Sequence, residues 1–321
     1  MVSGTNDRWL KMGVALPLIY EKLEPNLLWT QYIPAVREES NAFMYRYDSA
    51  GKSSNSKKET PPKHSFPGKL PEIDRSRKTV SSAVLESRGF SMRIPRDIIR
   101  NKKLGATEIR ECYDTAGYWL AEYINTSILT ELTTNGTTPT WTPTATWDDA
   151  SATPVSDLID FWLAFKREGY PFRFTDGFVD KTNWGELAKS VDNYDSDYKS
   201  KEKIYGLPDL GRETIRVPAA NCDIHLVSSG MTHGYLLGID RNNTAASLHY
   251  CNDPEFATAN ITYMTTDAGT NGQPKTVTVP NLGIHFNQYR EDGSKDTILE
   301  FWYENKCVVT KPYGINYDSG I

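Results

Sequence analysis

The 321-residue sequence lacks the features that mark secreted, membrane-spanning and disulfide-linked proteins. No stretch approaches the roughly 18 consecutive apolar residues of a transmembrane helix, and the start lacks the basic and apolar regions of a signal peptide. The four cysteines are widely spaced and form no C-x-x-C motif, which favours reduced thiols. These absences predict a soluble protein without a secretion signal.

Motifs of the common enzyme classes are also missing: there is no G-x-S-x-G and no H-E-x-x-H. The stretch GKSS at 51–54 resembles the end of a phosphate loop, but Arg46 stands where that motif requires glycine. Carboxylates that a glycosidase could use are better explained as solvated surface groups; they are Asp148, Asp149, Asp157, Asp160, Asp176 and Asp180. We therefore predict no enzymatic activity and no cofactor.

A zinc site is conceivable but not predicted. Cys222-x-x-His225 and His249-x-Cys251 could together supply four ligands. However, residues three apart on a strand point to opposite faces, and structural zinc sites favour knuckle-like turns. Ordinary core or surface roles explain these side chains better.

Negative charge is in small excess over the whole chain, but it is unevenly distributed. The net charge of −5 argues against a general basic surface for nucleic acid. Residues 46–80 nevertheless hold nine Lys/Arg against four Asp/Glu, with few aromatics interleaved for base stacking. Three roles stay open for this basic segment: contact with another subunit, which we favour, a solvated loop, or nucleic-acid binding.

Two helices are clear from apolar spacing. The first covers about seven turns, with Thr107 as its cap, Asn135-Gly136 as its stop, and one apolar face: Ile109, Cys112, Ala116, Leu120, Tyr123, Ile124, Ile128 and Leu132. The second begins at Thr153-Pro154 and stops at Gly169, and its apolar face comprises Val155, Leu158, Ile159, Trp162 and Phe165.

The remaining segments predict an arm, a hairpin and a β-rich second half. Pro17, Pro25 and Pro34 predict that residues 1–36 form an arm of short helical pieces. Residues 41–47 and 79–94 predict two strands around the polar segment 49–69, a long hairpin that needs support. From Ile215 onward strands dominate, so the chain is predicted as α+β with an antiparallel, meander-like half.

Four stretches in this order are informative together: TQYIPAVREESNAFMYRY, VLESRGFSMRIPRDIIRN with the long helix, Leu158–Ser190, and CVVTKPYGINYDSG. Their order resembles that of the major capsid proteins of tailed bacteriophages and archaeal tailed viruses, which have the Hong Kong 97-type fold. The resemblance implies an N-terminal arm (1–36), an extended hairpin loop (37–94), a peripheral domain with a spine helix (95–150 and 281–321) and an axial domain (151–280).

By the same resemblance, the chain is expected to self-assemble into pentamers and hexamers of an icosahedral shell around packaged double-stranded DNA. It would enclose that DNA without sequence-specific binding, reside in the virion after synthesis in the host cytoplasm, and contact no membrane. Further implied partners are a separate scaffolding protein, a portal and a decoration protein. The candidate intersubunit contacts are five loop lysines: Lys52, Lys57, Lys58, Lys63 and Lys69. No covalent cross-link is predicted.

Two alternatives stay open. An encapsulin-like protein compartment keeps the fold and changes the cargo. Encapsulins typically begin with a helix that binds inside the shell, whereas the prolines of this N-terminus favour the virus. A carbohydrate-binding or carbohydrate-cleaving protein is suggested by the Thr/Pro-rich connector 133–149 and the β-rich second half, and is opposed by the missing signal peptide.

Overall fold

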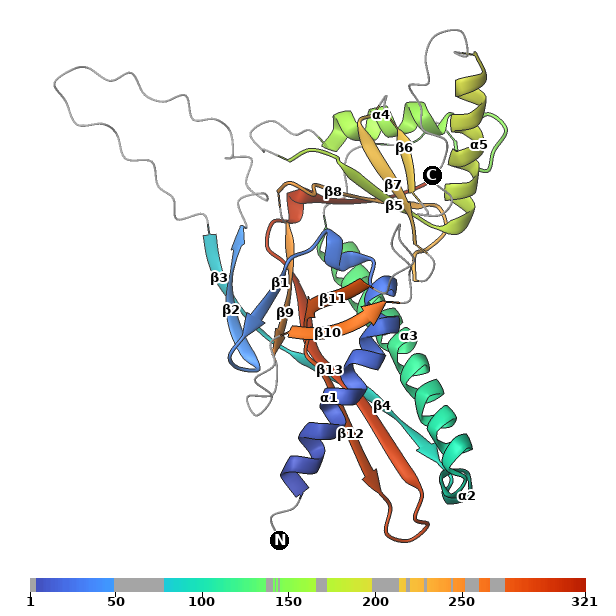
Figure 1. Cartoon of the computed structure of the whole chain (residues 1–321). Coiled ribbons are helices and arrows are strands. Elements are labelled where there is room, and N and C mark those ends of the chain that lie inside the picture. The colour runs from blue at the N-terminus through green and yellow to red at the C-terminus, as the bar shows by residue number, and fades with distance from the viewer. Residues whose placement is uncertain are drawn as a thin grey trace, which may run out of the picture. The chain divides into compact units, whose positions relative to one another are not determined.

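The chain divides into two compact units, each assembled from segments far apart in the sequence (Figure 1). The computed structural model describes residues 4–48, 78–136, 141, 143, 145–165, 172–197, 214–217, 220–227, 230–243, 245–251, 260–265 and 275–321. Unit 1 comprises Met1–Phe43, Ser82–Ile128 and Leu248–Cys307; unit 2 comprises Met44–Ser81, Leu129–Ser247 and Val308–Ile321. Helices and sheets are mixed in both, which confirms the α+β class. None of the described helices is long and apolar enough to span a membrane.

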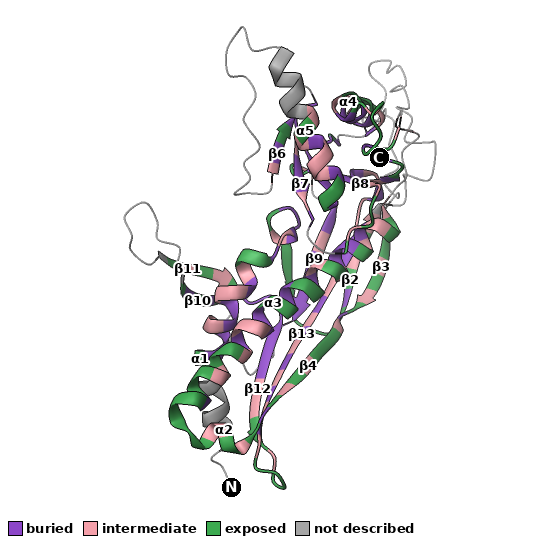
Figure 2. Ribbon diagram, turned by 90° about the vertical axis from the view of Figure 1, so that its right-hand side faces the viewer, coloured by how far each residue is buried: buried purple, intermediate pink, exposed green. Residues whose placement is uncertain are grey.

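Unit 1 is built on one mixed sheet. Its strand order is β1 (Ala35–Glu38), β9 (Ala246–Cys251), β13 (Thr297–Val309) and β12 (Ile284–Arg290), with β4 (Glu86–Ile94) also paired to β13. β13 is antiparallel to β12 and β4, whereas β1 is parallel to β9. Residues of β13 alternate between buried and half-buried along most of the strand (Figure 2). This period-two pattern is that of a strand with one face against a core.

Helix α3 (Lys102–Asn135) is the long helix that the sequence predicted, and it ends at the predicted residue. Its apolar stripe is buried at Ala116, Leu120, Ile124, Ile128 and Leu132. Two details of the prediction were wrong, the cap and the placement of Tyr123, whose side chain is 49% exposed.

The cap of α3 lies earlier than predicted. Asn101 Oδ1 accepts a hydrogen bond from the backbone N–H of Leu104 at 3.4 Å, so Asn101 occupies the capping position. The Thr107 hydroxyl instead donates to the carbonyl of Lys103 at 3.1 Å, inside the helix. The short helix α2 (Arg96–Arg100) directly precedes this start.

The predicted proline-broken arm was wrong at its start: residues Gly4–Leu23 form one continuous helix, α1, with Pro17 inside it. A proline removes the hydrogen bond to the carbonyl four residues before, here that of Gly13. Gly13 is exposed, so water can solvate this carbonyl. Five buried side chains hold the helix in place by packing: Ala15, Leu16, Ile19, Tyr20 and Leu23. Tertiary burial therefore outweighs the local cost of the proline.

The core of unit 1 lies between α1, α3 and the strands. α1 packs on β12 and on β10 (Asn260–Thr265), which pairs antiparallel with β11 (Lys275–Pro280) as a separate ribbon. α1 also meets α3 at Gly117, where an added Cβ would come within 2.7 Å of the carbonyl oxygen of Ile19. Only glycine permits this close helix–helix approach.

Unit 2 contains a five-stranded sheet of order β14 (Ile315–Ser319), β8 (Tyr235–Ile239), β5 (Asp176–Val179), β7 (Cys222–Leu226) and β6 (Thr214–Val217). The predicted antiparallel meander was wrong here, because β5 pairs parallel with β7 and antiparallel with β8. Helix α5 (Lys181–Asp197) follows β5 on the path to β6 and β7, and a parallel pair needs such a crossover connection.

Helix α4 (Pro154–Phe165) begins at the predicted proline, while the predicted stop at Gly169 lies outside the described residues. Its side chains Leu158, Phe161 and Phe165 join a hydrophobic cluster with Phe174, Ile224 and the C-terminal Ile321. An added Cβ at Gly238 would lie 2.6 Å from the Phe161 ring, so this strand position leaves room for the aromatic.

The first strand predicted around the polar segment is present as β2 (Ala42–Asp48), whereas the second, predicted as one run over 79–94, is divided into β3 (Lys78–Val84) and β4, and β4 pairs with β13 instead. β2 and β3 pair with each other in a two-stranded sheet, so the predicted hairpin pairing is confirmed for this part of the run. The segment between them lies outside the described residues.

Candidate functional site

The five predicted contact lysines cannot be placed: Lys52, Lys57, Lys58, Lys63 and Lys69 all lie in 49–77, outside the described residues. Their role as intersubunit contacts therefore stays a prediction. The described residues contain three other sets of polar and aromatic side chains that bear on function.

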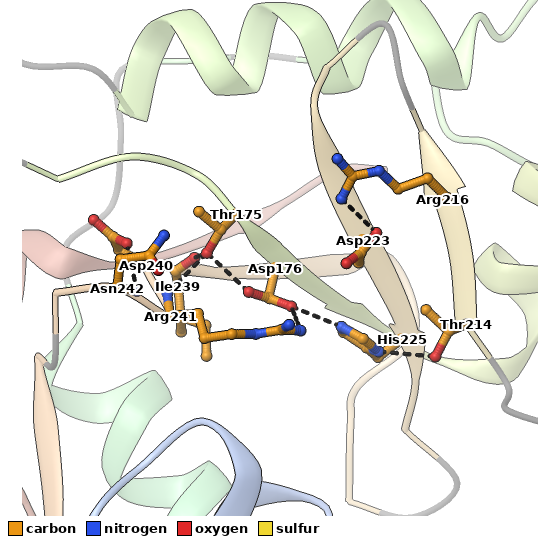
Figure 3. Close-up of polar contacts among 10 residues, drawn as sticks. All are labelled: Thr175, Asp176, Thr214, Arg216, Asp223, His225, Ile239, Asp240, Arg241 and Asn242. Carbon is orange, nitrogen blue, oxygen red and sulfur yellow. Dashed lines mark hydrogen bonds and ion pairs between the residues drawn. The ribbon is translucent and has the colours of Figure 1, made fainter. Parts of the chain in front are cut away.

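The first set is a row of polar side chains across three strands of unit 2 (Figure 3). Asp176 lies on β5, His225 on β7 and Thr214 on β6. His225 is in register with Phe178 on one side and with Thr214 on the other. Because Asp176 and Phe178 are two residues apart, their side chains share a face, and His225 reaches Asp176 diagonally.

Hydrogen bonds join this row into a buried polar cluster. His225 Nε2 lies 2.9 Å from Asp176 Oδ1, and His225 Nδ1 lies 3.1 Å from Thr214 Oγ1. The Thr175 hydroxyl donates to Asp176 Oδ2 at 2.8 Å, and the Arg241 guanidinium forms an ion pair with Asp176. The backbone N–H of Arg241 donates to Thr175 Oγ1 at 2.8 Å, so the same cluster fixes the start of the turn after β8.

Asp176 is only 1% exposed, yet its charged form is favoured. Burial alone raises the pKa of a carboxyl group, but the hydrogen bonds from His225 and Thr175 and the charge of Arg241 outweigh it and lower the pKa of Asp176. A buried charge requires such partners, because removing one leaves the other without compensation. The cluster therefore holds β5, β7 and β6 together, and we call it the Asp176 clamp.

The carboxylate, imidazole and hydroxyl have the order found in acyl-transfer sites. Their placement, however, fits the structural role of the Asp176 clamp better than a catalytic role. Each of the three groups lies on a regular strand, and Asp176 and His225 are buried. Sequence reasoning had treated Asp176 as a solvated carboxylate, which was wrong. Arg241, Thr175 and Thr214 were missed, because no local pattern marks them and only the strand order brings them together.

The prediction of a solvated carboxylate was also wrong for Asp157 and Asp180, which are buried and support local structure. Asp157 accepts a hydrogen bond from the indole N–H of Trp147 at 3.1 Å. Asp180 precedes α5, accepts the backbone N–H of Thr182 at 3.0 Å and lies 3.2 Å from His233 Nδ1. Asp148, Asp149 and Asp160 are exposed, as predicted.

The second set surrounds His249 in unit 1. His249 Nδ1 lies 2.6 Å from Glu38 Oε1, and its ring stacks on Phe43 with centroids 4.2 Å apart. The first contact attaches the edge strand β1 to β9, and the second attaches the start of β2 to β9. The other residues of the conceivable zinc site serve the two cores: Cys222 is buried in unit 2, where desolvation raises the pKa of its thiol, and Cys251 is buried in unit 1. No group of three or more metal-ligating side chains occurs among the residues that the structure describes.

The third set consists of aromatic side chains on the outer side of α3. Tyr118, Trp119 and Tyr123 are 50%, 45% and 49% exposed. Phe90 of β4 packs edge-on against Trp119 and Tyr123, with centroid distances of 5.2 and 6.2 Å. These exposed rings were not predicted, although Tyr118 and Trp119 directly before the stripe residue Leu120 are a usable signal.

Comparison with known proteins gives a match in structure and none in sequence. No protein-family model matches the chain, and no curated protein matches it. A virus-like particle protein from Pyrococcus furiosus has a TM-score of 0.52 and 9% identity, over 94% of this chain and 95% of its own. The SrpI encapsulin from Synechococcus elongatus also has a TM-score of 0.52, with 9% identity over 93% of this chain and 88% of its own.

A capsid protein of the cyanophage P-SCSP1u matches equally well, with a TM-score of 0.52 and 11% identity over 91% of this chain and 87% of its own. These likenesses extend over nearly the whole chain in each case. At such low identity they concern the fold, and they connect it with proteins whose names are those of shells and particles.

Proposed function

Because the chain has the Hong Kong 97-type fold, we propose that it is a major capsid protein. It self-assembles into pentamers and hexamers that form an icosahedral shell around packaged double-stranded DNA. The observation that carries the proposal is the whole-chain likeness to shell proteins, which includes the cyanophage capsid over 91% of this chain. A structural role without enzymatic activity is part of the proposal.

Local features support self-association. β2 and β3 form a two-stranded sheet that flanks a long polar segment, and an isolated ribbon of this kind is marginal in water. Contacts with neighbouring subunits would stabilise it, and a closed shell repeats every contact many times. Within this proposal the five loop lysines are intersubunit contacts, and the arm, loop, peripheral and axial ranges are the functional segments.

A second candidate is an encapsulin-like compartment, and one observation favours it. The prolines of the N-terminus had argued for the virus, but α1 is a continuous helix of 20 residues. That argument is therefore lost, and the encapsulin and the cyanophage capsid match with the same TM-score of 0.52. Cargo distinguishes the two candidates: a virus shell holds DNA, and a compartment holds protein.

Electron microscopy and sedimentation of the purified protein test the proposal. Closed icosahedral particles, or rings of five and six, are expected, and an absorbance ratio that indicates nucleic acid in particles from infected or producing cells would select the virus. Particles with protein cargo and no DNA would select the compartment. A chain that stays monomeric at high concentration, with and without a scaffolding protein, would contradict both. Binding to a glycan panel would then revive the carbohydrate alternative.

Scaffolding protein, portal and decoration protein belong to the proposal as partners, and the virion is the proposed location. Host-cytoplasmic synthesis and the lack of membrane contact follow from the same assignment. Purification of particles from a producing culture, followed by mass spectrometry of the co-purifying proteins, tests these partners directly.

A further inference from the structure

Positive charge gathers in unit 1 where α2 leads into α3. Residues 96–110 hold five Lys/Arg against two Asp/Glu, whereas the rest of α3, residues 111–135, holds four Asp/Glu and no Lys/Arg. Arg100, Lys102, Lys103 and Arg110 are all exposed, and Figure 2 shows exposed ribbon where α2 meets α3. None of the four side chains forms an ion pair with another residue that the structure describes. We call these four residues the basic corner.

The basic corner is held in place by close packing and by one carboxylate. An added Cβ at Gly105 would lie 3.1 Å from the Cα of Ile99, so the first turn of α3 lies directly against α2. Asp296, in the turn between β12 and β13, accepts the backbone N–H of Arg96 at 2.9 Å and lies 3.0 Å from Arg93 Nε. This turn therefore fixes the start of α2, and the corner is a preformed surface.

The charges of the basic corner oppose the dipole of the helix that carries them. The first turn of α3 contains Lys102 and Lys103 and no acidic residue. Because the amino end of a helix carries partial positive charge, cations are unfavourable there and anions are favourable. A preference broken without a compensating partner in the chain is expected at functional positions. An anion bound from outside would relieve the repulsion, so the corner fits a negatively charged ligand.

The arrangement fits the phosphate backbone of a nucleic-acid duplex. Lys103 and Arg110 are seven residues apart on one line of the helix surface, about 10 Å along its axis. Duplex DNA carries one negative charge per about 1.7 Å of its axis, so several phosphates lie within reach of the corner at once. Residues 96–110 contain no aromatic side chain on which unpaired bases could stack, which favours a duplex over a single strand.

We propose that the basic corner binds the phosphate backbone of double-stranded DNA. This inference rests on the proposed shell function, in which that DNA is the packaged duplex, and it names the residues of the wall that contact it. The contact is independent of base sequence, because phosphates carry no sequence information. Each subunit supplies only a few charges, so single contacts are weak and their repetition over a shell makes them effective.

DNA binding by the full-length protein in solution tests the proposal, with the fluorescence anisotropy of a labelled duplex of mixed sequence as the readout. Lys102→Gln/Lys103→Gln should weaken binding about tenfold at low salt. It should also lower the slope of log affinity against log salt by about 1.8, since each lost phosphate contact removes about 0.9. The matched control, Lys181→Gln/Lys189→Gln, removes the same charge from exposed positions of α5 and should change neither quantity. Equal losses in both variants would overturn the proposal.

A second pair of substitutions separates the basic corner from the other basic part of the sequence. Lys57→Gln/Lys58→Gln lies in the segment 46–80, and DNA binding that depends on this pair and not on Lys102 and Lys103 would overturn the proposal. Normal DNA binding by Lys102→Gln/Lys103→Gln together with loss of particles would also overturn it, because the corner would then contact another subunit. Circular dichroism checks that every variant is folded.

Lysine acylation of particles separates this inference from the shell function. In DNA-filled particles Lys102 and Lys103 should react less than in particles emptied of DNA, as measured by mass spectrometry, whereas Lys181 and Lys189 should react equally in both. Shells in which Lys102 and Lys103 are equally reactive with and without DNA would overturn only this inference. A chain that binds the duplex through these lysines and never assembles would overturn only the shell.

Discussion

The two units of this chain hold their sheets in different ways. In unit 1 the helices and strands approach through apolar contacts, with Gly117 allowing α1 and α3 to come close and with aromatic rings such as Tyr113, Phe286 and Phe301 between helix and sheet. In unit 2 three strands are also joined by the buried polar cluster around Asp176. We infer that unit 1 is sensitive to changes in volume, and that unit 2 is sensitive to changes in charge.

The largest effect is expected from Asp176→Ala. It leaves the buried His225 and the Thr175 hydroxyl without their acceptor, whereas the half-exposed Arg241 can be solvated, so we expect a loss of about 2–4 kcal/mol in the free energy of unfolding. Hydrogen exchange should increase in β5 and β7 and stay unchanged in β12 and β13. Asp223→Asn, which removes a half-exposed ion pair with Arg216 in the same sheet, should cost less than about 1 kcal/mol. Similar effects of both changes would contradict the clamp.

Gly117→Val tests whether unit 1 is sensitive to a change in volume. The added side chain collides with the backbone of Ile19 and Leu23, and overpacking of this kind costs about 1–3 kcal/mol. Hydrogen exchange should then increase in α1 and leave β5 and β7 unchanged. The matched control is Gly13→Ala on α1, where an added Cβ meets nothing within 4 Å; it should stabilise the helix by about 0.5–1 kcal/mol. Exchange that increases throughout both units would mean that they unfold together.

Tyr20→Phe tests a polar contact between α1 and the segment that precedes β12. Tyr20 donates to Asn281 Oδ1 at 3.1 Å and accepts the backbone N–H of Leu282 at 2.8 Å, and all three are buried. Loss of the hydroxyl leaves that N–H unsatisfied, so denaturant titration should show a loss of about 1–2 kcal/mol. An unchanged unfolding midpoint would mean that water replaces the hydroxyl.

The smallest effect is expected from a change of pH, which should alter the contribution of Asp176 to stability in unit 2 and leave unit 1 unaffected. The folded-state pKa of Asp176 is below its ordinary value of 3.8, so its contribution is fully present above pH 3.8 and is lost as the pH falls through the lower folded value. The difference in stability between the wild type and Asp176→Asn should therefore be constant near neutral pH and shrink below pH 3.8. For Gly117→Val the difference should not depend on pH. Parallel pH profiles for both variants would contradict the charge sensitivity of unit 2.

Local patterns in the sequence sufficed for elements whose ends and buried faces are marked locally. α3 was predicted because its stripe from Ala116 to Leu132 repeats over several turns, and β2 and β3 because alternating and polar stretches mark their ends. α1 was not predicted, since Pro17 is locally unfavourable and the compensation comes from β10 and β12, more than 200 residues away. The proposed family resemblance succeeded because it rests on the order of such elements.

The polar cluster could not be predicted for a related reason. Asp176, Thr214 and His225 are ordinary strand residues, and they meet only because β7 lies between β5 and β6. The pairing of β5 with β7 is parallel, and no local turn signal encodes a crossover of that length. The exposed aromatic side chains of α3 could have been predicted from the sequence, because Tyr118 and Trp119 stand outside the stripe that the helical period defines.

The parallel pairing of β1 with β9 and the docking of α1 on β12 have a consequence for the time course of synthesis. Glu38 and its partner His249 are 211 residues apart in the sequence, and Tyr20 and its partner Asn281 are 261 residues apart. At a translation rate of about 5–20 residues per second, the first helix waits on the order of 10–50 s before its final neighbours leave the ribosome. During that interval its apolar stripe is available to chaperones or to other nascent chains. Formation of unit 1 thus joins the first helix to strands that are synthesised more than 200 residues later.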